Sequence, residues 1–394
     1  MKKDISKLKF GSIIGWRGDS LVCPQAFGGD IFSGCSMGCW WCFCREMDHE
    51  LFNKYYTGWH RELVRSCDPD DYKKVFDKAF GSDKDYQDWS IKCLRHGLPF
   101  NMGSKAETFC IEDHDHKVVE KVLRLFIEYK VPVIFQTKSH YVGLKRYLDL
   151  IKQMKAAVIV SIMGGSDTLN YKLEPGAPPP SMRWLLVKEL NEAGIWTAVR
   201  WEPILIGINS TDEIFEGYRD NCIKSQAKHV SFYNYRSTMP RLAKEEFEKR
   251  GFDYIKLLKN NLDDNWINVG KRFFTIMKSS GIRVSTPDFI NFPFDSSCES
   301  CCGVDDLFTP YSFTFMKACK IIDQKGSISW NDMEAIDFKE PKAYDRMKKI
   351  WNKGRQYYSL VDSPGVMILD KDKNGYHIYG KKDNSKIKKV GLLW

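Results

Sequence analysis

The sequence predicts an α/β fold, a partial (β/α)6 barrel followed by a small C-terminal α+β appendage. Short apolar stretches typical of buried strands alternate with amphipathic segments of helical length from about residue 99 to residue 233. Strands and helices that alternate in this way form parallel βα units. The rest of the chain has helical stretches and one hairpin pattern. We therefore expect a barrel domain at residues 1–290 and an appendage at residues 291–394.

The expected elements follow one another in regular order. The strands are expected at residues 30–32, 99–102, 131–137, 157–162, 196–201 and 229–233. The helices between them are expected at residues 117–130, 143–154, 181–193 and 211–225. Residues 46–98 are polar, aromatic and interrupted by glycine and proline, so we expect helical insertions there. Helices at 234–281 and a strand at 282–286 follow the sixth strand.

Composition and charge limit the class of protein. The 394 residues are enough to bury a large core, and the formal charge of +9 permits anionic partners, nucleic acid included, without requiring them. No apolar run is long enough to span a bilayer, and the N-terminal segment lacks the apolar core of a signal peptide. Thirteen cysteines then indicate reduced thiols and metal binding. We expect a cytoplasmic protein with no membrane partner.

Three cysteines form the strongest local motif. Cys35, Cys39 and Cys42 have the spacing C-x₃-C-x₂-C in the loop 34–44, where Gly34 and Gly38 let the backbone fold tightly. Thiolates on such a loop can converge on one [4Fe–4S] cluster, and three ligands leave one iron open to a chelating cofactor. A structural zinc site with a fourth cysteine, or buried thiols without metal, are the alternatives.

Polar side chains mark the ends of the expected strands. In parallel α/β folds these carboxyl ends carry the functional groups. The residues at these ends are Ser104, Glu107, Lys138, Ser161 and Glu202, in chain order. Glu174, in a proline-rich segment, and Arg183, at a helix start, could pair with each other or Arg183 could bind a ligand carboxylate. Lys138 and Ser161 could equally be solvated strand ends.

These motifs together resemble the spore photoproduct lyase branch of the radical S-adenosylmethionine (SAM) superfamily. The resemblance is carried by the cysteine loop with Phe43 after its third cysteine, by Thr-Lys-Ser at 137–139, Val-Ser-Ile at 160–162, Leu-Glu-Pro-Gly-Ala-Pro at 173–178 and the trailing Arg183. It covers roughly residues 30 to 210. The resemblance implies a barrel of radical SAM type, with a [4Fe–4S] cluster on the three cysteines and SAM at the open iron.

The resemblance also implies roles for other residues. Phe43 would lie near the adenine of SAM, and Arg183 would be structural. The residues that would line the SAM or substrate pocket are Gly103, Ser104, Lys138 and Ser161. An electron donor of flavodoxin or ferredoxin type would reduce the cluster, and the cofactor would then supply a 5′-deoxyadenosyl radical.

Two departures from the family pattern bear on the reaction. The loop after the second strand of spore photoproduct lyases holds a cysteine that returns a hydrogen atom to the product radical, and Ser104 stands there in this chain. A serine O–H bond is too strong to donate readily. Cys44 replaces a tyrosine-type position after the cluster. Repair of a thymine dimer is therefore disfavoured, while Cys110 is a rival hydrogen-atom donor or simply a buried thiol.

We expect a nucleoside or nucleotide substrate, with queuosine or its 5′-phosphate, cleaved to queuine, as the best candidate. Hydrogen abstraction from a ribose can lead to release of its base. Glu107 and Glu202 could pair with the ammonium or the guanine-like edge of queuine, or instead with Lys105 and Arg200. The alternatives are a lyase for a DNA lesion and a non-catalytic iron–sulfur or zinc protein that binds nucleic acid.

The appendage contains a second cysteine group. Cys298, Cys301 and Cys302 could hold a second metal, donate a hydrogen atom, or form a reduced cysteine-rich turn. Helices are expected at 311–324 and 342–354, and the Asn-Gly pair at 374–375 predicts a hairpin over 366–379. A helix pair with a hairpin favours either a capping module or a winged-helix-like module that contacts nucleic acid.

Overall fold

The computed structural model describes most of the predicted barrel and isolated parts of the appendage. The described residues are 13–16, 23, 25, 27–42, 64–82, 88–235, 241–260, 263–288, 291–292, 295–309, 314, 317, 320–321, 324–325, 327–329, 331–332, 368–372 and 375–379. The chain divides into two compact units. The larger unit comprises Met1–Arg17 and Phe27–Arg283, and the smaller comprises Gly18–Ala26 and Val284–Trp394.

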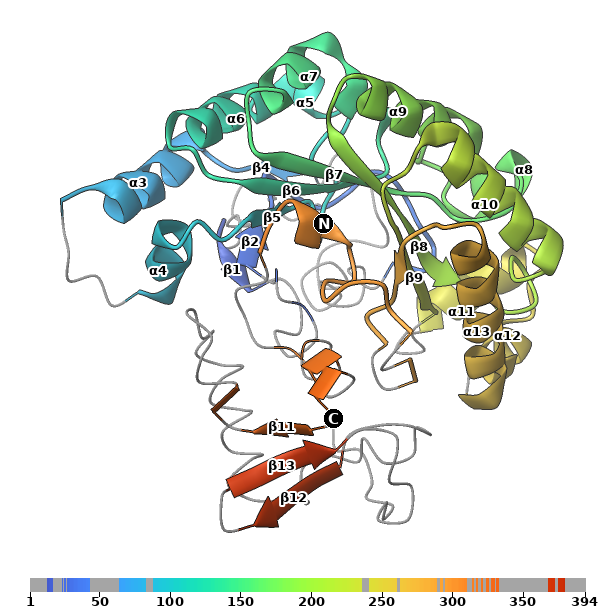
Figure 1. Cartoon of the computed structure of the whole chain (residues 1–394). Helices are drawn as coiled ribbons and strands as arrows, with labels where there is room; N and C mark the ends of the chain where they lie inside the picture. Colours follow the sequence, from blue (N-terminus) through green and yellow to red (C-terminus); the bar gives the residue numbers. More distant parts are fainter. Residues whose placement is uncertain are drawn as a thin grey trace. The chain divides into compact units, whose positions relative to one another are not determined.

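One sheet organises the larger unit, with its strands in the order β1-β2-β5-β6-β7-β8-β9 (Figure 1). The strands are β1 (Gly15–Trp16), β2 (Phe27–Gly29), β5 (Phe100–Met102), β6 (Val133–Thr137), β7 (Ala156–Ser161), β8 (Trp196–Ile204) and β9 (Val230–Asn234). β1 pairs antiparallel with β2, and every pair from β2 to β9 is parallel. Six parallel strands in chain order confirm the predicted partial (β/α)6 arrangement.

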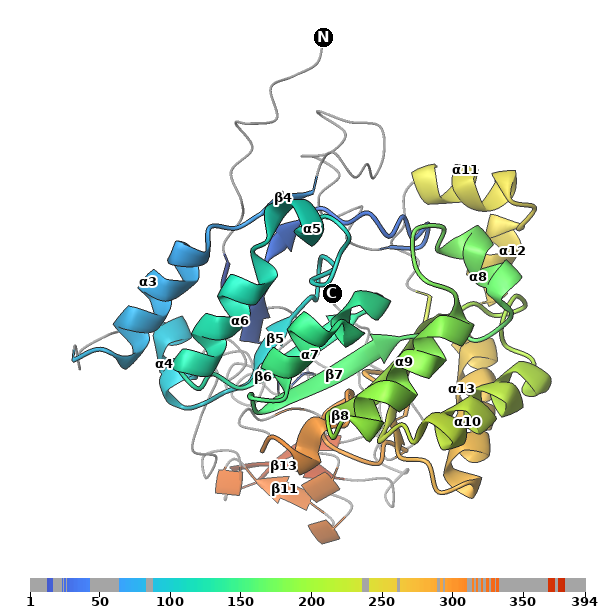
Figure 2. The same cartoon turned by 90° about the horizontal axis from the view of Figure 1, so that it is seen from above.

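The larger unit also has helices between its strands and after β9, and those that alternate with the strands cover one face of the sheet, as Figures 1 and 2 show. The helices are α3 (Pro69–Phe80), α4 (Trp89–Arg95), α5 (Asp113–His116), α6 (Val119–Glu128), α7 (Lys145–Ile151), α8 (Asp167–Leu173), α9 (Pro180–Glu192), α10 (Asp212–Ser225), α11 (Arg241–Lys249), α12 (Tyr254–Asn260) and α13 (Asp263–Ser279). Local sequence sets their starts. Pro180 occupies the first turn of α9, and the hydroxyl of Thr211 accepts a hydrogen bond at the start of α10.

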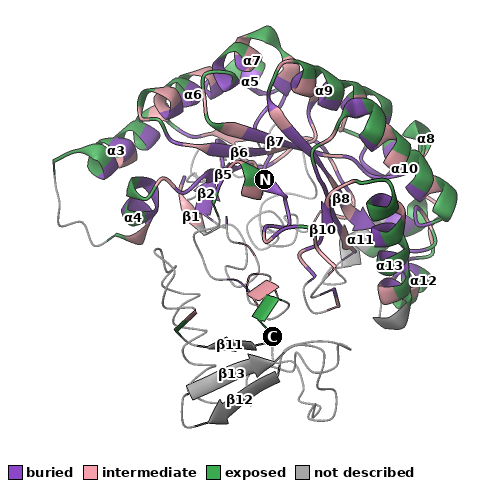
Figure 3. Cartoon of the chain, in the orientation of Figure 1, coloured by how far each residue is buried: buried purple, intermediate pink, exposed green. Residues whose placement is uncertain are grey.

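The core lies between the sheet and the helices, where Figure 3 shows the buried residues. Trp201 of β8 and Phe232 of β9 point to the helix side and pack on Phe273 of α13, with ring centroids 5.4 and 4.6 Å away. Side chains alternate along a strand, so Arg200 and Ser231 lie on the opposite, inner face. The inner face is thus where polar strand residues can meet a ligand.

The first strand differs from its prediction. It was expected at residues 30–32, but β2 ends at Gly29, and Phe32–Ser33 forms β3 and pairs with β4 (Arg65–Ser66). Close backbone contact explains the shift, because a Cβ on Gly28 would lie 1.9 Å from the Asn101 carbonyl oxygen and one on Gly29 would lie 1.7 Å from that of Ile13. Glycine has a low strand propensity, so the apolar pattern misplaced this strand.

The other elements of the barrel agree with their predictions. The later strands and the helices α6, α7, α9 and α10 are confirmed, with ends shifted by a few residues. α3 and α4 confirm helical insertions in the described part of residues 46–98, and Asp68 and Asp88 cap them.

The smaller unit contains a short strand, β10 (Val284–Ser285), and a three-stranded sheet with order β11-β13-β12. Its strands are β11 (Ser327–Ser329), β12 (Ile368–Asp372) and β13 (Gly375–Tyr379). β12 and β13 pair antiparallel from Asp372 and Gly375, which confirms the hairpin. The helices predicted at 311–324 and 342–354 lie largely or wholly outside the described residues. Within the described part of the chain, no helix is long and apolar enough to cross a membrane.

Candidate cofactor site

The three motif cysteines lie on a loop that follows β3. Cys39 is buried, Cys35 and Cys42 are half-buried, and Phe43 and Cys44 fall outside the described residues. Burial raises the pKa of Cys35 to about 12, and the neighbouring charges of Glu107 and Cys42 add to the rise. Burial likewise raises the pKa of Cys39, with contributions from Glu174 and from both other thiols. The three sulfurs are therefore close enough to interact electrostatically.

Three thiols on one loop are a donor set that an iron–sulfur cluster can use. Among the described residues, no group of three or more His, Cys, Asp or Glu side chains is arranged to hold a single metal ion. A four-iron cluster is larger, and its thiolate ligands bind different irons at its corners. Hydrogen bonding from the backbone of Met37 and of Glu107 opposes the rise in the pKa of Cys35, and backbone hydrogen bonds to sulfur are one way in which proteins tune a cluster. Thiolate donors on a half-buried loop with backbone hydrogen bonding suit a [4Fe–4S] centre.

Residues 173–176 support the cysteine loop through backbone hydrogen bonds. The Trp40 N–H donates to the Leu173 carbonyl at 3.1 Å, and the Gly176 N–H donates to the Met37 carbonyl at 3.0 Å. A Cβ on Gly176 would lie 2.3 Å from the Ser36 carbonyl oxygen. Because the obstacle is backbone, only glycine allows this approach.

The variant Gly176→Ala should push the cysteine loop out of place. We expect a loss of roughly 1–3 kcal/mol of unfolding free energy from overpacking, together with a lower iron content after anaerobic reconstitution. The matched control is Gly217→Ala, since a Cβ there meets no atom within 4 Å on the exposed side of α10. That control should gain about 0.5–1 kcal/mol and keep its iron. Equal iron content in both variants would contradict the bracing role of Gly176.

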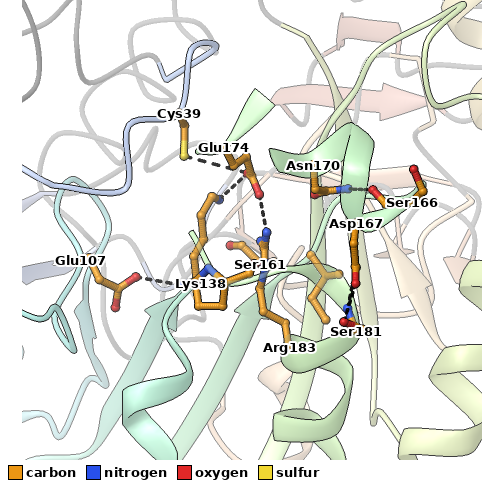
Figure 4. A network of polar contacts seen from close by, with 12 residues as sticks. Cys39, Glu107, Lys138, Ser161, Ser166, Asp167, Asn170, Glu174, Ser181 and Arg183 are labelled. Carbon is orange, nitrogen blue, oxygen red and sulfur yellow. Dashed lines mark hydrogen bonds and ion pairs between the residues drawn. The ribbon is translucent and has the colours of Figure 1, made fainter. Parts of the chain in front are cut away.

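A buried network of charged side chains, formed by Glu174, Lys138 and Arg183, contacts the cysteine loop at Cys39 (Figure 4). Glu174 is fully buried, and its Oε2 accepts a hydrogen bond of 2.6 Å from Arg183, which is also fully buried. Its Oε1 lies 3.6 Å from the Lys138 ammonium and 4.0 Å from the Cys39 sulfur. Burial alone would raise the pKa of Glu174, but the charges of Arg183 and Lys138 outweigh it and hold this pKa below its usual value. Glu174 therefore stays ionised beside the loop.

Arg183 is committed to structural contacts. Besides Glu174, its guanidinium donates to the carbonyl oxygens of Pro178 and Ser161, each at 2.7 Å. It thereby ties α9 to the end of β7. This arrangement agrees with the structural role that the resemblance implies. Of the two cations that pair with Glu174, Arg183 is fully buried, whereas 16% of the Lys138 side chain is exposed. Lys138 also lies over the Trp41 ring, 4.7 Å from its centroid.

The loop after β5, residues 103–107, is the next part of the site. Gly103 has φ +85°, and a Cβ there would lie 2.3 Å from the Gln136 carbonyl oxygen, so glycine is required. The Ser104 hydroxyl is buried and has no hydrogen-bond partner among the described residues. Buried Asp30 accepts from the backbone N–H groups of Lys105 and Ala106, which fixes this loop to the segment that leads into the cysteines.

Glu107 faces the protein backbone. Its carboxylate accepts hydrogen bonds from the Thr137 hydroxyl at 2.6 Å and from the N–H groups of Lys138 and Phe109 at 2.8 and 3.1 Å. Burial raises the pKa of Glu107, and these hydrogen bonds oppose the rise. Glu107 therefore connects the β5 and β6 strand ends, and hydrogen bonding from its backbone also reaches Cys35.

Cys110 lies close to a further anchor of the cysteine loop. Its thiol is 3% exposed and interacts with Glu112, which accepts a 3.0 Å hydrogen bond from the Ser36 hydroxyl. Burial, and then the Glu112 charge, raise the pKa of Cys110. Cys110 is therefore a protonated thiol next to the loop.

A polar row crosses the inner face of the sheet. Arg200 of β8 donates to the Gln136 side-chain oxygen, and the Gln136 amide donates to the Asn101 side chain at 2.6 Å. Glu202 lies 3.8 Å from the Arg200 Nε, which is the internal pairing considered for it from the sequence, and its side chain is 30% exposed. Ser161 is the register partner of Arg200 on β7. The structure thus brings Ser161, Arg200 and Glu202 together.

Sequence reasoning missed several supporting residues. Asp30, Asn101, Glu112 and Gln136 were not singled out, although each fixes a functional segment. A usable signal existed for Asn101 and Gln136, since each is a polar residue inside an apolar strand. No comparable signal existed for Asp30 and Glu112, whose partners lie far away along the chain.

The second cysteine group belongs to the smaller unit. Cys298, Cys301 and Cys302 are buried, and the Cys298 sulfur lies 3.1 Å from the Ser285 hydroxyl and 3.4 Å from the Ser300 carbonyl oxygen. Asp305 accepts from the Glu299 and Ser300 N–H groups and so closes the turn. A metal-binding or hydrogen-donating role for these cysteines stays a prediction.

Comparisons with known proteins found similarity only among solved structures, since no protein-family model and no curated protein matches the chain. A spore photoproduct lyase mutant with bound AdoMet and dinucleoside spore photoproduct is 17% identical, covers 65% of this chain and 73% of its own, and has a TM-score of 0.44. Streptococcus suis SuiB bound to precursor peptide SuiA is 16% identical over 71% of this chain and 54% of its own, with a TM-score of 0.44. These similarities concern the fold alone.

Proposed function

We propose that this protein is a radical SAM enzyme whose [4Fe–4S] cluster is held by Cys35, Cys39 and Cys42. The observation that carries the proposal is three cysteines with the spacing C-x₃-C-x₂-C on the loop after β3, in a chain that folds as a six-stranded parallel partial barrel. The three cysteines would hold the cluster, which together with SAM and an electron donor of flavodoxin or ferredoxin type would supply a 5′-deoxyadenosyl radical.

Groups suited to SAM surround the loop. The Lys138 ammonium, 16% exposed beside Trp41, is the cation that we assign to the SAM carboxylate, and Ser161 lies at the end of the adjacent strand. Gly103 permits close approach of the β5 loop. Phe43, which we assign to the adenine, lies outside the described residues. These residues would bind and orient SAM, while the cofactor supplies the radical.

We further propose a nucleoside-type substrate, with queuosine or its 5′-phosphate as the candidate and release of queuine as the outcome. The support is the polar row on the inner face, since amide, guanidinium and carboxylate groups match the donor and acceptor edge of a nucleobase. Glu202, 30% exposed, is the carboxylate assigned to the secondary ammonium of queuine.

Three further residues of the β5 loop have assigned roles in this proposal. Glu107 holds the backbone of Lys138 and Thr137 in place, so its contribution is to position the strand end. Ser104 offers a buried hydroxyl with no hydrogen-bond partner among the described residues, available to a ligand. Cys110 is the protonated thiol that could return a hydrogen atom.

Anaerobic turnover tests the function. Reconstituted protein with SAM, reductant and queuosine or its monophosphate should yield 5′-deoxyadenosine and free queuine, measured by chromatography and mass spectrometry. The Cys39→Ala variant is the control, and should yield neither product. Formation of 5′-deoxyadenosine with no free base, together with repair of dimer-bearing DNA, would replace queuosine with a DNA lesion as the substrate.

A further inference from the structure

Glu174 is a buried anion in contact with a proposed cluster ligand. Its side chain is 0% exposed, its Oε1 lies 4.0 Å from the Cys39 sulfur, and Figure 4 shows it between Cys39, Lys138 and Arg183. With a free thiol this contact is a weak S–H···O hydrogen bond. A thiolate bound to a cluster has no proton to donate, so the same contact becomes one between two negative groups.

Two cations hold that anion in place. Arg183 binds the Oε2 of Glu174 at 2.6 Å and is itself fixed by two backbone carbonyls. The Lys138 ammonium, 3.6 Å from Oε1, is stacked on Trp41 of the cysteine loop. Arg183 would by itself suffice to neutralise Glu174. The second oxygen is instead turned toward Cys39 and Lys138, so the carboxylate is shared between the fold and the loop.

We propose that Glu174 is a positioning residue that holds Lys138 against the cysteine loop and lowers the reduction potential of the cluster. The inference rests on the proposed cluster at Cys35, Cys39 and Cys42. Negative charge beside a cluster favours its oxidised state, and burial prevents solvent from screening that charge. Loss of Glu174 also leaves the positive charge of Lys138 beside the loop without its paired carboxylate, which shifts the potential in the same direction.

The inference is tested by removing the negative charge and each positive charge in turn, because these changes should shift the midpoint potential of the cluster in opposite directions. The midpoint potential of the reconstituted cluster is measured by EPR-monitored titration in Glu174→Gln, Lys138→Met and Arg183→Met. Glu174→Gln should raise the potential relative to wild type, while the two cation variants should lower it. A purely structural role for the network would loosen the loop in all three variants, and so would not produce shifts of opposite sign.

Further variants separate charge from folding and from the proposed function. The double variant Glu174→Gln/Arg183→Met removes both fully buried charges together, so that neither is left without the other, and should keep the cluster with a potential between those of its parents. Arg219→Met, which removes a half-buried cation of α10, is the matched control and should leave the potential unchanged. An unchanged potential in Glu174→Gln, or equal shifts in all variants, overturns the inference. Wild-type protein that assembles no cluster overturns the proposed function instead.

Discussion

Replacing Cys35, Cys39 or Cys42 by alanine should each time abolish the cluster, so that iron per chain falls from about four to near zero after anaerobic reconstitution. The reason is that the three thiols lie together on one braced loop and supply every protein ligand of the proposed centre. Losing one leaves two irons open, which a cluster rarely tolerates. Iron and sulfide analysis with the visible absorption spectrum measures the loss.

Two controls make this result specific. Cys44 is only two positions beyond Cys42, but it lies outside the C-x₃-C-x₂-C spacing and is not one of the three assigned ligands. Cys44→Ala should therefore retain full iron content. Cys222→Ala removes a buried thiol from α10, outside the loop, and should also retain it. Retention of the cluster in Cys35→Ala, Cys39→Ala or Cys42→Ala, or its loss in Cys44→Ala with the fold intact, would contradict the ligand assignment.

The variant Arg183→Met should cost about 3–5 kcal/mol of unfolding free energy. It removes the closest partner of a fully buried carboxylate and also leaves two carbonyl oxygens, those of Pro178 and Ser161, without their donor. A desolvated charge that loses its partner keeps its desolvation penalty, which is why the loss is large. Urea unfolding of the variant and the wild type measures the difference.

A double-mutant comparison identifies the cause. Adding Glu174→Gln to Arg183→Met removes the stranded charge and should restore most of the lost stability. Arg219→Met disrupts an ion pair with Asp220 whose two side chains are 26% and 50% exposed, and should cost at most about 1 kcal/mol. A loss below that level in Arg183→Met would show that the buried pair contributes little to the fold.

The regular part of the barrel was predictable from the sequence because its signals are local. The strand 131–137 is an apolar run, and α9 and α10 carry a proline start and a threonine cap that depend only on neighbouring residues. The Asn-Gly pair at 374–375 likewise specified the hairpin of β12 and β13. The first strand was misplaced because its glycines are chosen by contact with Asn101 and Ile13, which no local pattern reveals.

The sequence by itself determined the cysteine loop, the succession of parallel strands and the strand-end positions of Lys138 and Ser161, whereas Glu202 lies within β8, which runs to Ile204. These follow from spacing and periodicity within short windows. Only the tertiary structure decided that Glu107 faces backbone N–H groups, that Glu174 lies between Arg183 and Cys39, and that Asn101, Gln136 and Arg200 form one row. These contacts join residues from 9 to 135 positions apart. Their energies depend on burial and charge in three dimensions, and a buried carboxylate has the same letter in the sequence as an exposed one.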